Sequence, residues 1–224
     1  FSGYSDIAIG TSRLFGFDLM KNFAFPYFSR DIAEFWRRWH ISLSTWFRDY
    51  LYIPLGGSRG GTWMKIRNTF IIFIVSGFWH GANWTFIVWG ALNAIYFLPL
   101  LLRNKNRVNT NNVAEGKLLP SIKETLSILL TFALTVIAWI FFRAKNISHA
   151  WEYLTTIFSK STFSIPNFPG MRNALTVIIL ITLFTIIEWL GREKEFAIAN
   201  IENKLNKTSR RTVYYVLIIA IIYF

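Results

Sequence analysis

The sequence contains no cysteine among its 224 residues, and it contains only three histidines. The lack of cysteine excludes disulfides, thiolate metal sites and a cysteinyl acyl intermediate within this chain. The sequence also shows no carboxylate pair, no Ser-His-Asp arrangement and no cluster with metal-ligand spacing. We therefore expect no metal site and no bound cofactor, and histidine becomes the first candidate for acid–base chemistry.

Acidic residues are scarce, because 12 Asp and Glu face 24 Lys and Arg, for a net charge of +12. In a soluble protein this balance would suggest nucleic acid as the partner. Here 53% of the residues are hydrophobic, with 10 Trp and 22 Phe, and the mean hydropathy is +0.36. The basic residues flank apolar runs, as in cytoplasmic loops of membrane proteins. The composition thus predicts a polytopic protein of the lipid bilayer that does not bind nucleic acid.

Long apolar runs occupy residues 69–102, about 121–142, 171–190 and 213–224. They predict an all-α integral membrane protein, with residues 1–224 forming a single membrane domain. The chain begins at Phe1 without a signal-type n-region, and it stops at Phe224 inside a run too short to cross a bilayer. We therefore expect it to be an internal piece of a longer protein.

The run at 69–102 is too long for one span and too short for two. Its 34 residues would form a helix of roughly 50 Å against a hydrocarbon core of about 30 Å. We expect two short helices, broken or re-entrant, that meet near "HGANW". Irregular backbone at that depth is tolerated only beside protein or a wet cavity, so the break indicates an internal cavity. If the run returns to its own side, the basic loops place residues 1–68, 103–123 and 191–211 in the cytoplasm and 143–172 outside.

Residues 29–61 form a basic, aromatic segment ahead of that run. Ser29 is the expected N-cap and "PLGG" the expected stop, so residues 30–52 should be largely helical. Spacing places four side chains on one helix face, namely Trp36, His40, Leu43 and Phe47. Arginine and tryptophan in such a helix suit an interfacial membrane anchor as well as a functional site, so both interpretations stay open.

Four blocks of the sequence resemble the membrane-bound O-acyltransferases, and most of all their bacterial branch that acetylates alginate or peptidoglycan. They are "FSGYSDIAIG" at 1–10, "EFWRRWHISLSTWFRDYLYIPLGG" at 34–57, "SGFWHGANWTFIVWGALN" at 76–93 and "IAWIFFRAKNISHAWEYL" at 137–154. The resemblance implies a helical bundle with a central funnel, in which an acyl group passes from a cytoplasmic thioester toward an acceptor on the far side. The N-terminal helices of that family are absent from this chain.

The resemblance also implies roles for the two histidines. The essential histidine of the family falls on His80, and a second, upstream histidine falls on His40. From the residues alone, His80 is either a packed histidine in the break or a base for a hydroxyl proton, for which an imidazole pKa near 6.5 is suited. We expect His80 to be the base and His40 to support it. His149 is expected to be structural.

Candidate substrate contacts follow from charge and position. Guanidinium groups pair well with phosphate, so donor binding is expected of Arg37, Arg38, Arg48 and Arg59. Membrane phospholipid would give the same signal. Trp79 and Asn83, beside His80, are candidates to bind the developing oxyanion. The expected donor is acetyl-CoA or another acyl thioester.

The sequence therefore predicts a multi-pass O-acetyltransferase of the bacterial inner membrane. It would act toward an exported, alginate-like polysaccharide or pass acetyl to an extracytoplasmic acetyltransferase partner. The alternatives with the same chemistry are D-alanyl transfer to teichoic acid and O-acetylation of peptidoglycan. From another class, a channel or transporter with His80 in its pore remains an alternative.

Overall fold

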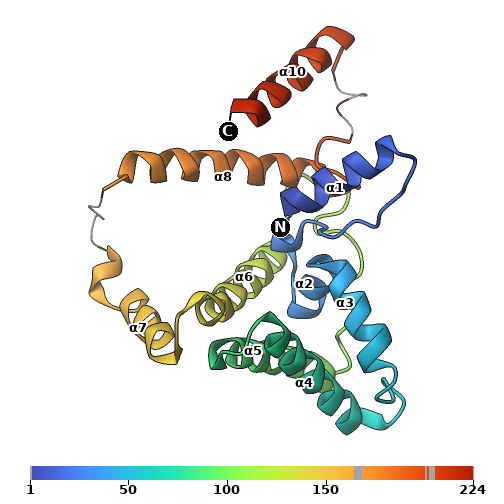
Figure 1. The fold of residues 1–224 in the computed structure, drawn as a ribbon, viewed down its shortest axis with the longest axis vertical. Coiled ribbons are helices and arrows are strands. Elements are labelled where there is room, and N and C mark those ends of the chain that lie inside the picture. Colours follow the sequence, from blue (N-terminus) through green and yellow to red (C-terminus); the bar gives the residue numbers. More distant parts are fainter. Residues whose placement is uncertain (1, 164–168, 200, 202–204, 224) are drawn as a thin grey trace. The chain divides into compact units, whose positions relative to one another are not determined.

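The computed structural model describes residues 2–163, 169–199, 201 and 205–223 (Figure 1). Every regular element in this described part is a helix, which confirms the expected all-α fold. Three described helices are long and apolar enough to cross a membrane, at Trp84–Leu102, Ile122–Arg143 and Asn173–Gly191. The chain is thus a helical membrane protein. It forms two compact units, residues 1–166 and 167–224, a finer division than the single domain expected from the sequence.

The first unit opens with α1 (Ser2–Leu14) and the short turn η1 (Pro26–Phe28), followed by α2 (Ile32–Arg38). Asp31 caps α2, because its side chain accepts a hydrogen bond from the Glu34 N–H at 2.7 Å. The expected cap at Ser29 is wrong. The Ser29 hydroxyl instead donates to the Pro26 carbonyl at 2.7 Å and closes the turn before the helix.

The segment expected to be largely helical over 30–52 is interrupted at His40. It continues as α3 (Ile41–Phe47) and the π-type turn η2 (Arg48–Tyr52). His40 itself adopts the left-handed conformation, with φ 45° and ψ 56°. Asn22 holds this bend from outside, since its carbonyl accepts from the Ile41 N–H at 2.9 Å and its side chain accepts from the Ser42 hydroxyl at 3.0 Å.

The bend changes which side chains share a face. Trp36, Leu43 and Phe47 line one cavity, whereas His40 does not line it. The predicted four-residue face is therefore wrong at His40, because helical spacing cannot be counted across a left-handed residue.

The apolar run folds into two antiparallel helices, α4 (Gly61–His80) and α5 (Trp84–Leu102), which lie side by side (Figure 1). They meet at the "GAN" of residues 81–83, where the Asn83 side chain caps α5 by accepting from the Thr85 N–H at 3.0 Å. α4 begins eight residues before the apolar run, so it has 20 residues and a length of about 30 Å. The helices are therefore longer than the short pair expected from the run alone. That the pair is re-entrant stays a prediction.

The helices α6 (Ile122–Arg143) and α7 (Ile147–Ile157) complete the packing around α5, and η3 (Lys160–Phe163) follows. Ser121 and Glu124 form a reciprocal capping box that starts α6. A core cluster joins the three helices through Trp89, Ala138, Phe141 and Ala150. This cluster fixes the end of α6 beside the break after His80.

The second unit contains α8 (Met171–Gly191) and α10 (Lys207–Tyr223). The apolar side chains of α8 are largely exposed along the helix, as expected for a helix that faces lipid. Within the segment 143–172, which we predict to face outside, residues 164–168 lie outside the described residues.

Candidate active site

His80 is the last residue of α4, and four aromatic rings surround its imidazole. Its ring centroid lies 4.9 Å from that of Trp79, 4.9 Å from Phe142, 5.3 Å from Trp89 and 6.3 Å from Phe86. These rings come from α4, α5 and α6, so three helices must be in place to form the aromatic cage, as we name these four residues. A cage of this kind lowers the local dielectric while leaving the imidazole partly open to solvent.

The bend at His40 brings the second histidine toward the same place. His40 lies close enough to His80 for its charge to act there, and its ring packs 5.9 Å from Phe23. Burial lowers the pKa of His40 below its ordinary value of 6.5. The structure thus brings together the two histidines singled out in the sequence.

Two buried polar groups on α5, one of them on Trp89 of the aromatic cage, were missed by the sequence analysis. Trp89 is 4% exposed and Thr85 is fully buried, one helical turn apart on α5. Among the described residues, neither the Trp89 Nε1–H nor the Thr85 hydroxyl finds a hydrogen-bond partner. Buried donors are seldom left unpaired, so such groups mark a site for water or substrate. Thr85 and Trp89 are four residues apart in the sequence just after the Asn83 cap, and this helical spacing is the signal that could have indicated them.

The oxyanion candidates named from the sequence are placed differently. Asn83 uses its oxygen to cap α5, and its Nδ2 donates to the Lys145 carbonyl at 3.0 Å. Trp79 is largely exposed and contacts His80 with the edge of its ring. Asn83 therefore fixes the break between the helices, while Trp79 forms one wall of the aromatic cage.

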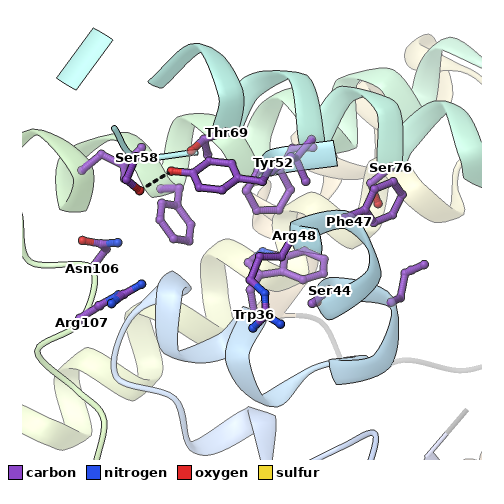
Figure 2. A pocket seen from close by; sticks show the side chains of 15 residues that line it. Trp36, Ser44, Phe47, Arg48, Tyr52, Ser58, Thr69, Ser76, Asn106 and Arg107 are labelled. Carbon is purple, nitrogen blue, oxygen red and sulfur yellow. Dashed lines mark hydrogen bonds between the residues drawn. The ribbon is translucent and has the colours of Figure 1, made fainter. Parts of the chain in front are cut away.

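A cavity of about 240 Å³ opens between α3, η2, α4 and the segment that follows α5 (Figure 2). Its inner wall is apolar, with Trp36, Phe73 and Phe97 among the lining residues. Its polar lining residues are Ser44, Arg48, Tyr52, Ser58, Thr69, Ser76, Asn106 and Arg107.

The cavity and the aromatic cage share a wall. Ser76 lines the cavity and lies one helical turn before His80 on α4. Trp36 also lines it and packs at 5.8 Å against Trp89, which in turn contacts His80. A molecule in this cavity is therefore separated from the aromatic cage by a single layer of side chains.

The sequence of the chain is similar to those of known proteins. Residues 1–111 match the model of MBOAT, the membrane-bound O-acyltransferase family. The chain belongs to this family. The resemblance noted in the sequence is thereby confirmed.

Three relatives from different bacteria illustrate the similarity. The chain is 43% identical over 192 residues to the probable alginate O-acetylase AlgI of Pseudomonas aeruginosa, covering 85% of this chain and 35% of the relative. It is 44% identical over 154 residues to the peptidoglycan O-acetyltransferase of Helicobacter pylori, covering 69% and 28%. It is 38% identical over 154 residues to the teichoic acid D-alanyltransferase of Streptococcus thermophilus, covering 63% and 37%. The chain thus spans about a third of the length of these relatives.

The arginines expected to bind a donor differ in what they contact in this family member. Arg37 and Arg38 are hydrogen-bonded within the protein, mainly to backbone carbonyls of residues 106–111. Arg48 lines the cavity and pairs with Asp49 at 2.6 Å, and Arg59 is exposed on the turn before α4. Arg107, which the sequence analysis did not single out, lines the cavity together with Arg48. Donor binding by the four predicted arginines stays a prediction.

Proposed function

We propose that this chain forms the acyl-transfer site of a membrane O-acyltransferase, which moves acetyl from a thioester toward a hydroxyl of an exported polysaccharide. The observation that supports this proposal best is His80 itself. It lies at a helix break, inside a ring of aromatic side chains, next to unpaired buried donors and a cavity. The relatives named above act on alginate, peptidoglycan and teichoic acid.

In this mechanism His80 is the general base. Its neutral imidazole takes the proton of the acceptor hydroxyl while that oxygen attacks the thioester carbonyl and forms the new C–O bond. The tetrahedral intermediate carries a negative oxygen, for which Trp89 Nε1–H and the Thr85 hydroxyl are donors in a site of low dielectric. The C–S bond then breaks, and the imidazolium returns the proton to the leaving sulfur. The products are an acetyl ester and a free thiol.

The cavity beside the aromatic cage is proposed as the donor site. The two arginines Arg48 and Arg107 suit the phosphate of coenzyme A or phosphopantetheine. The thioester end of the donor would then have to pass the layer that contains Trp36 and Ser76 to reach His80. We further propose that the protein lies in the bacterial inner membrane. The acceptor would be an alginate-like polysaccharide, or acetyl would pass first to an extracytoplasmic acetyltransferase partner.

The test uses the full-length protein in cells that lack their own version, with His80→Ala compared to His149→Ala. His149 is the matched control, because it lies on α7, where its side chain accepts a bond from the Lys145 N–H at 3.3 Å and packs against Tyr153, outside the aromatic cage. We expect His80→Ala to lower ester-linked acetate on the surface glycan by at least about 100-fold at equal membrane levels, and His149→Ala to leave it unchanged.

Each contrary outcome identifies an alternative. Acetate unaffected by His80→Ala would overturn the role of His80. Transfer of D-alanyl but not acetyl groups would assign the chain to the teichoic acid branch. Solute flux that depends on His80, without any acyl turnover, would favour the channel alternative.

A further inference from the structure

The segment between α5 and α6, residues 103–121, is fixed to α2 by hydrogen bonds from arginine side chains. Arg37 donates from Nη1 to the Asn106 carbonyl at 2.7 Å and from Nη2 to the Asn109 carbonyl at 2.8 Å. From the opposite direction, Asn109 Nδ2 donates to Asp31 at 2.6 Å. One guanidinium thus spans four residues of the loop, 106–109, and defines its curvature.

A second set of contacts holds the end of the same loop. Glu34 is 1% exposed and pairs with Arg30 at 3.1 Å and with Arg38 at 3.0 Å. Both arginines also donate to the Asn111 carbonyl, at 2.7 Å from Arg30 and 3.2 Å from Arg38. Glu34, Arg30 and Arg38 form a triad that is largely buried. Losing either arginine would therefore leave the negative charge of the buried Glu34 carboxylate only partly paired.

The loop matters because it supplies part of the cavity wall. Asn106 and Arg107, from the segment that follows α5, both line the cavity (Figure 2). The carbonyl that Arg37 holds belongs to Asn106, the residue directly before Arg107. The position of the Arg107 side chain therefore depends on a bond made by Arg37 outside the cavity.

We infer that Arg37 is a positioning residue for the acyl donor: it clamps residues 106–109 so that Arg107 faces the cavity and meets the donor phosphate. Arg37 itself does not line the cavity. This inference rests on the proposed function for its substrate, but the clamp itself can be tested without any acyl transfer.

Among the arginines of this network, Arg37 is the best choice for substitution. Its side chain is exposed, unlike those of Arg30 and Glu34, so its removal leaves no buried charge unpaired. Arg103 is the matched control. It is an exposed arginine of the same loop that does not line the cavity. Both substitutions remove one positive charge, and only Arg37→Ala removes the clamp.

The kinetic test measures acetyl transfer from acetyl-CoA by the purified full-length protein. We expect Arg37→Ala to raise the KM for acetyl-CoA about tenfold with kcat within about twofold of the wild type. Arg107→Ala should give a similar rise, and the double variant should be no worse than Arg107→Ala alone, since both act through one contact. Arg103→Ala should leave KM unchanged. Additive effects, or a normal KM in Arg37→Ala, would overturn the inference.

Limited trypsin digestion tests the clamp independently of catalysis. Arg37→Ala, and Asn109→Ala, which removes the loop-side contact without changing charge, should be cut after Lys105 or Arg107 about tenfold faster than wild type. Arg103→Ala should be cut there at the wild-type rate. Equal rates in Arg37→Ala and wild type would overturn the clamp even if the KM for acetyl-CoA rises. If the wild type itself fails to use acetyl-CoA, the proposed donor is wrong and the digestion still decides on the clamp.

Discussion

At the scale of the residue, His40 contributes both a left-handed backbone and an imidazole ring, and most substitutions would change both at once. His40 is a left-handed residue with φ 45°, and it also lies close enough to His80 to act on it electrostatically. Asparagine tolerates the left-handed region, so His40→Asn should preserve the bend. We expect this variant to reach normal membrane levels while surface acetate falls between about 10- and 100-fold, because the variant removes the imidazole whose electrostatic influence reaches His80.

The control for His40→Asn is His40→Val, which tests the effect of the backbone conformation. A β-branched residue is poorly tolerated at positive φ, so it should reduce the amount of folded protein as well as the acetate. Folded protein is measured by size-exclusion chromatography of the detergent extract. Wild-type acetylation in His40→Asn would show that the position needs only its backbone geometry and that the imidazole has no part in transfer.

At the scale of the element, the sequence was informative where local chemistry decides the structure. The break at "HGANW" follows from Gly81 and the capping Asn83, and the structure places it at residues 81–83. The bend at His40 has no such local signal, since apolar spacing continues through it and Asn22, distant in sequence, holds it. The roles of Arg37 and Arg107 were also hidden, because loop contacts between residues about 70 positions apart follow from tertiary packing alone.

The contact between α4 and α5 depends on glycine at two crossing points. A Cβ added at Gly90 would lie 2.2 Å from the Phe73 carbonyl oxygen, and one at Gly77 would lie 2.3 Å from the Phe86 carbonyl oxygen. Backbone atoms cannot move aside as side chains do, so Gly90→Ala must push the helices apart. We expect a loss of at least about 1–3 kcal/mol of stability, seen as a lower melting temperature of the purified protein. Gly10→Ala on α1, where nothing lies within 4 Å, is the control and should melt like the wild type.

At the scale of the whole molecule, we predict that the cavity opens on the cytoplasmic side of the membrane, provided that α4 and α5 return to the side from which they enter. The mouth residues Arg48, Ser58 and Arg107 all belong to segments that the positive-inside rule places in the cytoplasm. An acyl thioester made in the cytoplasm would therefore reach the cavity without crossing the membrane. The arrangement requires that α4 and α5 return to the cytoplasm together and that α6 crosses once.

The absence of cysteine from this chain makes that arrangement directly testable. We would introduce Lys105→Cys in the loop after α5 and Glu152→Cys on α7, both at exposed positions, in a full-length background with any other cysteines replaced. A membrane-impermeant maleimide should label Glu152→Cys in intact spheroplasts and Lys105→Cys only in inverted vesicles. Labelling of both from the same side would mean that α6 does not separate them. Labelling of Lys105→Cys from outside would put the mouth of the cavity on the wrong side for a cytoplasmic donor, and the proposed direction of transfer would have to be reversed.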